Sequence, residues 1–153
     1  MGYYTKKQLE KIGFKSLGVD VKISDRASIY NANKIEIGDY SRIEDFCTLA
    51  YGVMVFTQSD DYSGATMTNS TIPKQYKTEV KQPVLIKRHS IIGAGSIIFP
   101  GVTLNEGTSV GAMSLIRKST EEWSIYVGNP AVKIKNRKKD LLELEKQYLA
   151  GGE

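Results

Sequence analysis

Two adjacent carboxylates, Asp60 and Asp61, and the only histidine, His89, are the side chains of this chain best suited to proton transfer. The carboxylate pair could hold an ammonium group or receive its proton, although an acidic pair in a loop is more often simply solvated. A histidine can serve as a general base. These residues therefore favour chemistry in which an amine or a hydroxyl group is deprotonated, provided that other elements position them.

The region around His89 repeats with a period of six residues. Neither a helix period of 3.6 nor a strand period of 2 explains this spacing, which is typical of a parallel β-helix. We predict a left-handed coil of three hexads, in which the aliphatic residue points inward and a small residue two positions earlier turns the corner. The aliphatic positions are Ile86, Ile92, Ile98, Leu104, Val110 and Ile116, and the small or β-branched ones are Ser90, Ser96, Val102, Thr108 and Ser114.

The first part of the chain has the same repeat, with one slip. The aliphatic positions there are Leu17, Ile23, Ile29, Ile37, Ile43, Leu49 and Val55. The step from Ile29 to Ile37 contains Asn31, and we interpret it as a two-residue insertion at a corner, because Asn tolerates left-handed backbone. Cys47 is the only cysteine, so an internal disulfide and a cysteine-rich metal site are excluded. Its position in the hexad predicts core packing.

The repeat stops after Phe56 and resumes at Val84, which leaves a loop over residues 57–83 with few aliphatic residues. A loop of this length in a compact repeat is uncommon and is usually functional. Asp60 and Asp61 lie in it. We therefore expect the loop to contact the substrate through the carboxylates and through their neighbours Gln58, Ser59, Tyr62 and Ser63.

Both ends of the chain depart from the coil. A capping box at Thr5 to Gln8 predicts a helix over residues 5–11 that covers the open end of the β-helix. The extension over 120–153 contains a turn and a strand-like run, followed by an amphipathic helix that ends at Gly151. The predicted fold is a single all-β domain over residues 1–153, a left-handed parallel β-helix with coils at about 17–56 and 84–119, a short N-terminal helix and a C-terminal α-helix.

The ladder from Ile86 to Ile116, followed by the segment Val127 to Ala131, resembles the hexapeptide-repeat acyltransferases, which use acyl-CoA. The loop from Phe56 to Gly64 further resembles the branch that acetylates nucleotide-linked amino sugars, above all dTDP-4-amino-4,6-dideoxyglucose in surface-polysaccharide synthesis. The resemblance implies N-acetyl transfer from acetyl-CoA to such a sugar. It also implies a homotrimer with active sites between subunits, and a histidine as the usual base.

Small residues on successive coils could accommodate the extended pantetheine arm of acetyl-CoA. These residues are Gly93, Ala94 and Ser96, and, one coil later, Gly111, Ala112 and Ser114. The alternative is that the glycines only ease the corners. Basic residues that follow could bind the phosphates through charge-assisted contacts. The remaining expected cofactor contacts are Lys118, Pro130, Lys133 and Arg137.

Other functions fit this sequence less well. A zinc hydratase on the same fold needs three histidines, and no metal is expected here. The basic cluster between Lys133 and Lys139 lacks interleaved aromatic residues, which disfavours nucleic acid as a partner. No apolar run is long enough for a membrane span and none follows the N-terminus, so we expect a cytoplasmic protein. Sugar O-acetylation remains an alternative, and so does a catalytically weak or structural module that lacks coils. Two features weaken the transfer of function from the family: the loop has no histidine, where related O-acetyltransferases tend to have one, and the first half looks short.

Overall fold

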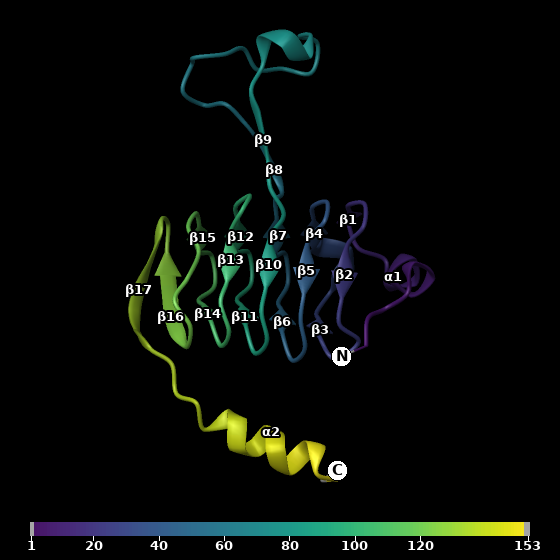
Figure 1. The fold of residues 1–153 in the computed structure, drawn as a ribbon, viewed down its shortest axis with the longest axis vertical. Coiled ribbons are helices and arrows are strands. Elements are labelled where there is room, and N and C mark those ends of the chain that lie inside the picture. The colour runs from purple at the N-terminus through teal and green to yellow at the C-terminus, as the bar shows by residue number, and fades with distance from the viewer. Residues whose placement is uncertain (1, 152–153) are drawn as a thin grey trace.

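The computed structural model describes residues 2–151, which form a three-sided prism of short strands with an arm and two helices attached (Figure 1). The first face contains β1 (Ser16–Leu17), β4 (Glu36–Ile37), β7 (Met54–Val55), β12 (Ile97–Ile98) and β15 (Leu115–Ile116). The second contains β2 (Lys22–Ile23), β5 (Arg42–Ile43), β10 (Leu85–Ile86) and β13 (Thr103–Leu104). The third contains β3 (Ser28–Ile29), β6 (Thr48–Leu49), β11 (Ile91–Ile92), β14 (Ser109–Val110), β16 (Ser124–Gly128) and β17 (Ala131–Asn136).

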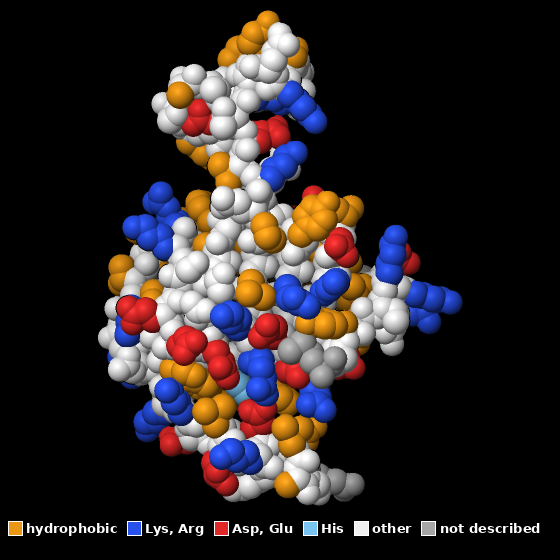
Figure 2. Space-filling view, in the orientation of Figure 1, with side chains coloured by type: hydrophobic (Ala, Val, Ile, Leu, Met, Phe, Trp, Pro, Cys, Tyr) orange, Lys and Arg blue, Asp and Glu red, His pale blue; other side chains and the backbone are white. Residues whose placement is uncertain are grey.

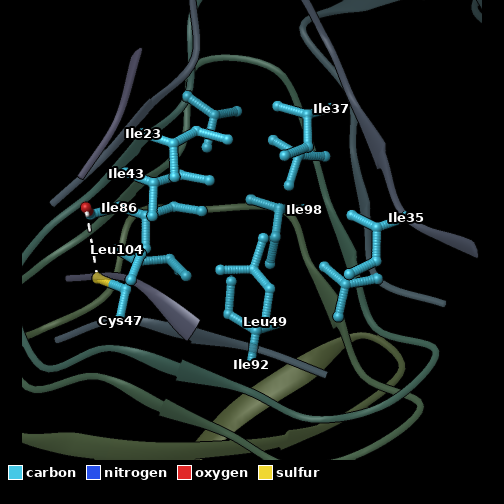
Figure 3. Close-up of a cluster of buried hydrophobic side chains, with 14 of the residues drawn as sticks. Ile23, Ile35, Ile37, Ile43, Cys47, Leu49, Ile86, Ile92, Ile98 and Leu104 are labelled. Carbon is cyan, nitrogen blue, oxygen red and sulfur yellow. Dashed lines mark hydrogen bonds between the residues drawn. The ribbon is translucent and has the colours of Figure 1, made fainter. Parts of the chain in front are cut away.

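Equivalent strands of consecutive coils pair in parallel and in register, so that Ile86 lies between Ile43 and Leu104. The aliphatic side chains consequently stack in columns inside the prism (Figure 3). Every predicted inward position from Ile86 to Ile116 is at most 2% exposed, which confirms the hexad assignment. Burying each such side chain contributes about 2 kcal/mol relative to leaving it in water.

At several corners the small residue of the hexad donates a hydrogen bond from its own hydroxyl group. Ser90 Oγ donates to the carbonyl of Lys87 at 2.7 Å, and Thr108 Oγ1 donates to that of Asn105 at 2.6 Å. Each hydroxyl thus satisfies a carbonyl three residues earlier, which a buried corner requires. Cys47 takes the same place and is 1% exposed, so its predicted core role is confirmed. Burial raises the pKa of its thiol to about 12.

The predicted loop over 57–83 is an arm that stands away from the prism (Figure 1). The sequence suggested an irregular segment, but its base is a two-stranded antiparallel ribbon of β8 (Gln58–Asp60) and β9 (Glu79–Lys81). A 3₁₀-helical turn, η2 (Lys74–Tyr76), lies near its far end. The arm leaves the prism after β7 and returns before β10, so both attachments are at one corner of the third coil.

The two ends largely follow the predicted elements. Helix α1 (Lys6–Ile12) begins at the Thr5 capping box and ends at Gly13 in the left-handed region, with φ of 77°. Asn31 has φ of 53° and precedes η1 (Ala32–Lys34), which confirms the corner insertion. Strands β16 and β17 form an antiparallel hairpin, and α2 (Leu141–Leu149) follows. Within residues 2–151, neither helix has the length and apolarity needed to cross a bilayer.

Candidate functional site

The carboxylate of Asp61 organises the first turn of the arm. Its two oxygens accept hydrogen bonds from the backbone amides of Ser63 at 2.9 Å and Thr66 at 3.1 Å. The hydroxyl groups of the same two residues also donate to it, at 2.6 Å and 2.8 Å. These bonds, above all that from the Ser63 hydroxyl, lower the pKa of Asp61 to about 2. A carboxylate held in this way is a poor proton acceptor, and its evident role is to shape the turn.

Asp60 differs from its neighbour because its carboxylate is exposed and makes no hydrogen bond within the described part of the chain. It ends β8 and lies opposite Glu79 of β9. Glu79 in turn pairs with Lys77 and Lys81, each at 3.5 Å. Asp60 is therefore an exposed carboxylate on the ribbon, available to an external group.

The four expected substrate-binding neighbours lie on the same arm but in different settings. Tyr62 is 91% exposed. Gln58 lines a small cleft of about 140 Å³ at the base of the arm, where Asp39 and Tyr40 form the opposite wall. Ser59 is half-buried on β8, and Ser63 is bound to Asp61. The arm thus brings the predicted substrate residues together as a group.

His89 lies at a corner between β10 and β11, in the left-handed region with φ of 61°. Its ring stacks on Phe46 at a centroid distance of 5.3 Å and lies 6.0 Å from Trp123 on the other side. Its Nε2 atom is 2.6 Å from Oε2 of Glu145 in α2. At 8% exposure, the histidine is enclosed by protein groups.

The structure does not bring His89 and the acidic pair together within one chain. The arm extends from one side of the prism, whereas α2, which contacts His89, lies along the other (Figure 1). Charged side chains of both signs crowd the part of the surface next to α2 (Figure 2). His89 and the acidic pair are therefore two separate sites on this chain.

The glycines proposed for the cofactor are required by coil stacking. A Cβ on Gly93 would lie 2.5 Å from the backbone nitrogen of Ala112, and one on Gly111 would lie 2.7 Å from Val127 Cγ2. The close approach of successive coils explains both glycines, and neither has a positive φ. The result is a narrow surface on which Ala94 is half-buried and Ala112 is exposed.

Two of the expected cofactor residues, Ser96 and Ser114, are buried in the single chain. Ser96 and Ser114 are 0% and 2% exposed, and their hydroxyl groups both donate to the carbonyl of Gly111. As corner residues of the hexad they point into the prism. Since neither retains surface for a ligand, they do not line a cofactor groove in the single chain.

Three other expected cofactor residues converge at the C-terminal end of the prism. Lys118, Pro130 and Lys133 line a cleft of about 560 Å³ between β15 and the β16–β17 hairpin. Arg117 also lines it, so the cleft is strongly basic. Lys133 Nζ is 2.5 Å from Oε2 of Glu121, an exposed pair that an anionic ligand could replace. This cleft suits the phosphates of a nucleotide cofactor.

Arg137, which was also expected to contact the cofactor, bonds to backbone carbonyls of the prism. Its Nη1 atom donates to the carbonyl of His89 at 2.6 Å and to that of Gly107 at 3.1 Å. Burial lowers the pKa of its guanidinium group. Arg137 therefore fastens the chain to the His89 corner and does not line the cleft with Lys118 and Lys133.

The sequence did not reveal the groups that surround His89. Glu145 appeared only as a polar residue of an amphipathic helix, and it contacts His89 across 56 residues. Arg88 also pairs with Glu145. No local sequence pattern predicts the contact of Glu145 with this corner. The only available signal is that Arg88 and His89 are adjacent, which places two potential cations together.

Comparisons with known proteins agree with this architecture. No protein-family model matches the chain. It is 35% identical to a dTDP-4-amino-4,6-dideoxy-D-glucose acyltransferase of Escherichia coli, over 97% of this chain and 95% of that protein. Among solved structures, it matches AntD, an N-acyltransferase from Bacillus cereus, in complex with dTDP and 3-hydroxybutyryl-CoA. The identity is 39% and the TM-score 0.67, and the match covers 98% of each chain. An AntD variant in complex with dTDP-4-amino-4,6-dideoxyglucose and coenzyme A also has a TM-score of 0.67, at 39% identity and 97% coverage of each chain.

The alignment to the Escherichia coli protein leaves gaps in this chain. It spans 183 positions, whereas 97% of 153 residues is about 148, so about 35 positions face gaps in this chain. Two coils of eighteen residues have about this length, and removing whole coils preserves the hexad register. The chain belongs to the left-handed β-helix, hexapeptide-repeat acyltransferases, in the branch that contains dTDP-4-amino-4,6-dideoxy-D-glucose acyltransferase.

Proposed function

We propose that this chain transfers an acyl group from acyl-CoA to the 4-amino group of dTDP-4-amino-4,6-dideoxyglucose. The observation that carries the proposal is the match to AntD, a protein solved with that sugar and with coenzyme A, along nearly the whole of both chains. The exposed carboxylate of Asp60 and the basic cleft at Lys118 add support, since the first suits an amine and the second suits phosphates.

In the proposed reaction, the ammonium group of the sugar first loses a proton, and Asp60 holds this group and receives the proton. The neutral amine then attacks the thioester carbonyl, so that a C–N bond forms and the C–S bond breaks. Coenzyme A leaves as a thiolate and takes up the second proton, which the attacking nitrogen loses as it becomes an amide. Asp61 does not act as the base in this scheme, because four hydrogen bonds already hold its carboxylate. It positions the turn that presents Asp60 and Tyr62.

The acyl donor is proposed to lie along the surface formed by Gly93, Ala94, Gly111 and Ala112, with its phosphates near Lys118 and Lys133. Backbone groups of this surface hold the pantetheine arm, and one amide stabilises the oxyanion. We propose acetyl as the acyl group, from the resemblance of the loop to sugar N-acetyltransferases. The 3-hydroxybutyryl-CoA bound to AntD makes 3-hydroxybutyryl the main competitor.

We further propose a homotrimer, in which the arm of one subunit reaches the cofactor surface of the next. The arm projects away from its own prism (Figure 1), which supports a site completed by a second copy. Light scattering at micromolar concentration is expected to give three times the mass of one chain, and a monomer would argue against shared sites. Both substrates are soluble nucleotides, which supports a cytoplasmic step in surface-polysaccharide synthesis.

Thiol release tests the proposed function. The enzyme is incubated with acetyl-CoA or 3-hydroxybutyryl-CoA and with dTDP-4-amino-4,6-dideoxyglucose, and dTDP-glucose serves as the acceptor that has only hydroxyl groups. Release that depends on the amino sugar and is greatest with acetyl-CoA is the expected result. Equal release with dTDP-glucose would point to O-acylation, and no release with either acceptor would contradict the proposal.

A further inference from the structure

We propose that the segment from Arg137 to Leu149 is a strap, which opens as a unit from one corner of the prism while the prism remains folded. The strap comprises α2 and the four residues before it. This inference does not depend on the proposed function. It rests on how the strap is held and on what it covers.

Apolar packing contributes little to holding the strap. No residue of α2 is buried, and Leu144 and Tyr148 are 63% and 60% exposed. Between the helix and the prism lies a cleft of about 320 Å³, which Ile91 and Leu141 also line. A helix of nine residues is not stable alone in water. Some other interaction must therefore keep α2 ordered against the prism.

Polar contacts at two points supply that interaction. The side chain of Glu145 is only 12% exposed and lies between Arg88 and His89, with Oε2 at 2.6 Å from the imidazole Nε2. Arg137 donates to the carbonyls of His89 and Gly107. Both anchors end on the same corner. Because charge-assisted hydrogen bonds of this kind are strong and specific, loss of one partner should release the strap.

The strap lies over two of the three residue types that occur once in this sequence. His89 is the only histidine, and Trp123, 6.0 Å from it, is the only tryptophan. Lys139 of the strap lies 5.8 Å from the Trp123 ring. Opening must therefore uncover the imidazole and change the surroundings of the indole. The reactivity of His89 and the fluorescence of Trp123 can therefore be used to follow the strap without attaching a probe.

Glu145→Gln tests the strap with little change in shape, and Glu143→Gln is its matched control. Glu143 is an exposed residue of the same helix, whose ion pair is with Lys146 at 3.9 Å. Opening is measured by hydrogen exchange of the α2 amides and by the rate at which diethyl pyrocarbonate modifies His89. Trp123 fluorescence follows the same event. The thermal midpoint of the prism is recorded in parallel.

In Glu145→Gln, we expect both α2 exchange and His89 modification to be about tenfold faster, with a shift in Trp123 emission. Glu143→Gln should behave like the wild type, and exchange in the prism strands should not change. In the double variant Arg88→Gln/Glu145→Gln, exchange of the α2 amides should be no faster than in the faster of the two single variants. Unchanged exchange in Glu145→Gln would overturn the proposal. Faster exchange throughout the prism would overturn it as well.

Discussion

The imidazole Nε2 of His89 lies 2.6 Å from Oε2 of Glu145, and the histidine ring is enclosed between Phe46 and Trp123. Within this chain the imidazole is thus held by protein groups. The resemblance of the sequence to the hexapeptide-repeat acyltransferases implies a histidine as the usual base, so the surroundings of His89 bear on whether this residue has that role. Here they favour a structural role.

His89→Asn should therefore leave turnover within about threefold of the wild type, because no proton transfer depends on the ring. Asn tolerates the left-handed backbone of this corner, which makes it the least disruptive replacement. The lost stacking should cost about 1–3 kcal/mol of unfolding free energy. Steady-state kinetics and thermal unfolding measure the two effects. A fall in turnover of about a hundredfold or more would make His89 the base.

Asp60→Asn and Asp61→Asn should affect different kinetic constants. Asp60→Asn should lower turnover by about a hundredfold or more, because it removes the proposed proton acceptor. Asp61→Asn should chiefly raise the Michaelis constant for the amino sugar, because an amide group cannot accept all the bonds from Ser63 and Thr66. Initial rates over a range of sugar concentrations distinguish them. The opposite order of effects on turnover would move the base to Asp61.

The turn at Asp61 should have a characteristic pH dependence. The folded-state pKa of about 2 lies below the ordinary value of 3.8, so its stabilising contribution is present above about pH 4. That contribution is lost as pH falls from about 4 through about 2. The backbone amide resonances of Ser63 and Thr66 should titrate with a midpoint near 2. They should not titrate with this midpoint in Asp61→Asn, and a wild-type midpoint near 4 would show that the turn does not hold the carboxylate.

Charge reversal in the basic cleft should affect binding of the acyl donor. Lys118→Glu and Lys133→Glu should each raise the Michaelis constant for acyl-CoA by about tenfold with little loss of turnover, because phosphate contacts are equal in the ground and transition states. Lys138→Glu changes the net charge equally at an exposed residue outside the cleft and is the control. Unchanged constants for both cleft variants, or an equal effect at Lys138, would place the phosphates elsewhere.

The sequence was most informative where structure depends on local repetition. Three features follow from residue types at short, regular spacing. They are the buried columns that contain Ile86 and Ile92, the corners with a hydroxyl hydrogen bond, and the Thr5 capping box. Such patterns work because each hexad repeats the same surroundings. The aliphatic residue of each hexad therefore predicts the inward position on a face of the prism, and the small residue predicts the corner.

Contacts between distant elements could not be inferred in this way. The pairing of Glu145 with His89 depends on the path of the chain after β17, and the bonds of Arg137 depend on the same path. Asp60 and Asp61 looked equivalent until the hydrogen bonds of Ser63 and Thr66 distinguished them. Ser96 and Ser114 occupy the same hexad position as Cys47, and their burial follows from that position.

The central claim is that the amino group of the dTDP-linked sugar is the acceptor. The most direct measurement is the structure of the product, obtained by mass spectrometry and NMR after incubation of the protein with acetyl-CoA and dTDP-4-amino-4,6-dideoxyglucose. The account predicts a mass gain of one acetyl group and an amide at the nitrogen on C4. An acetyl ester on a sugar hydroxyl, or unchanged sugar in the presence of active protein and donor, would contradict it.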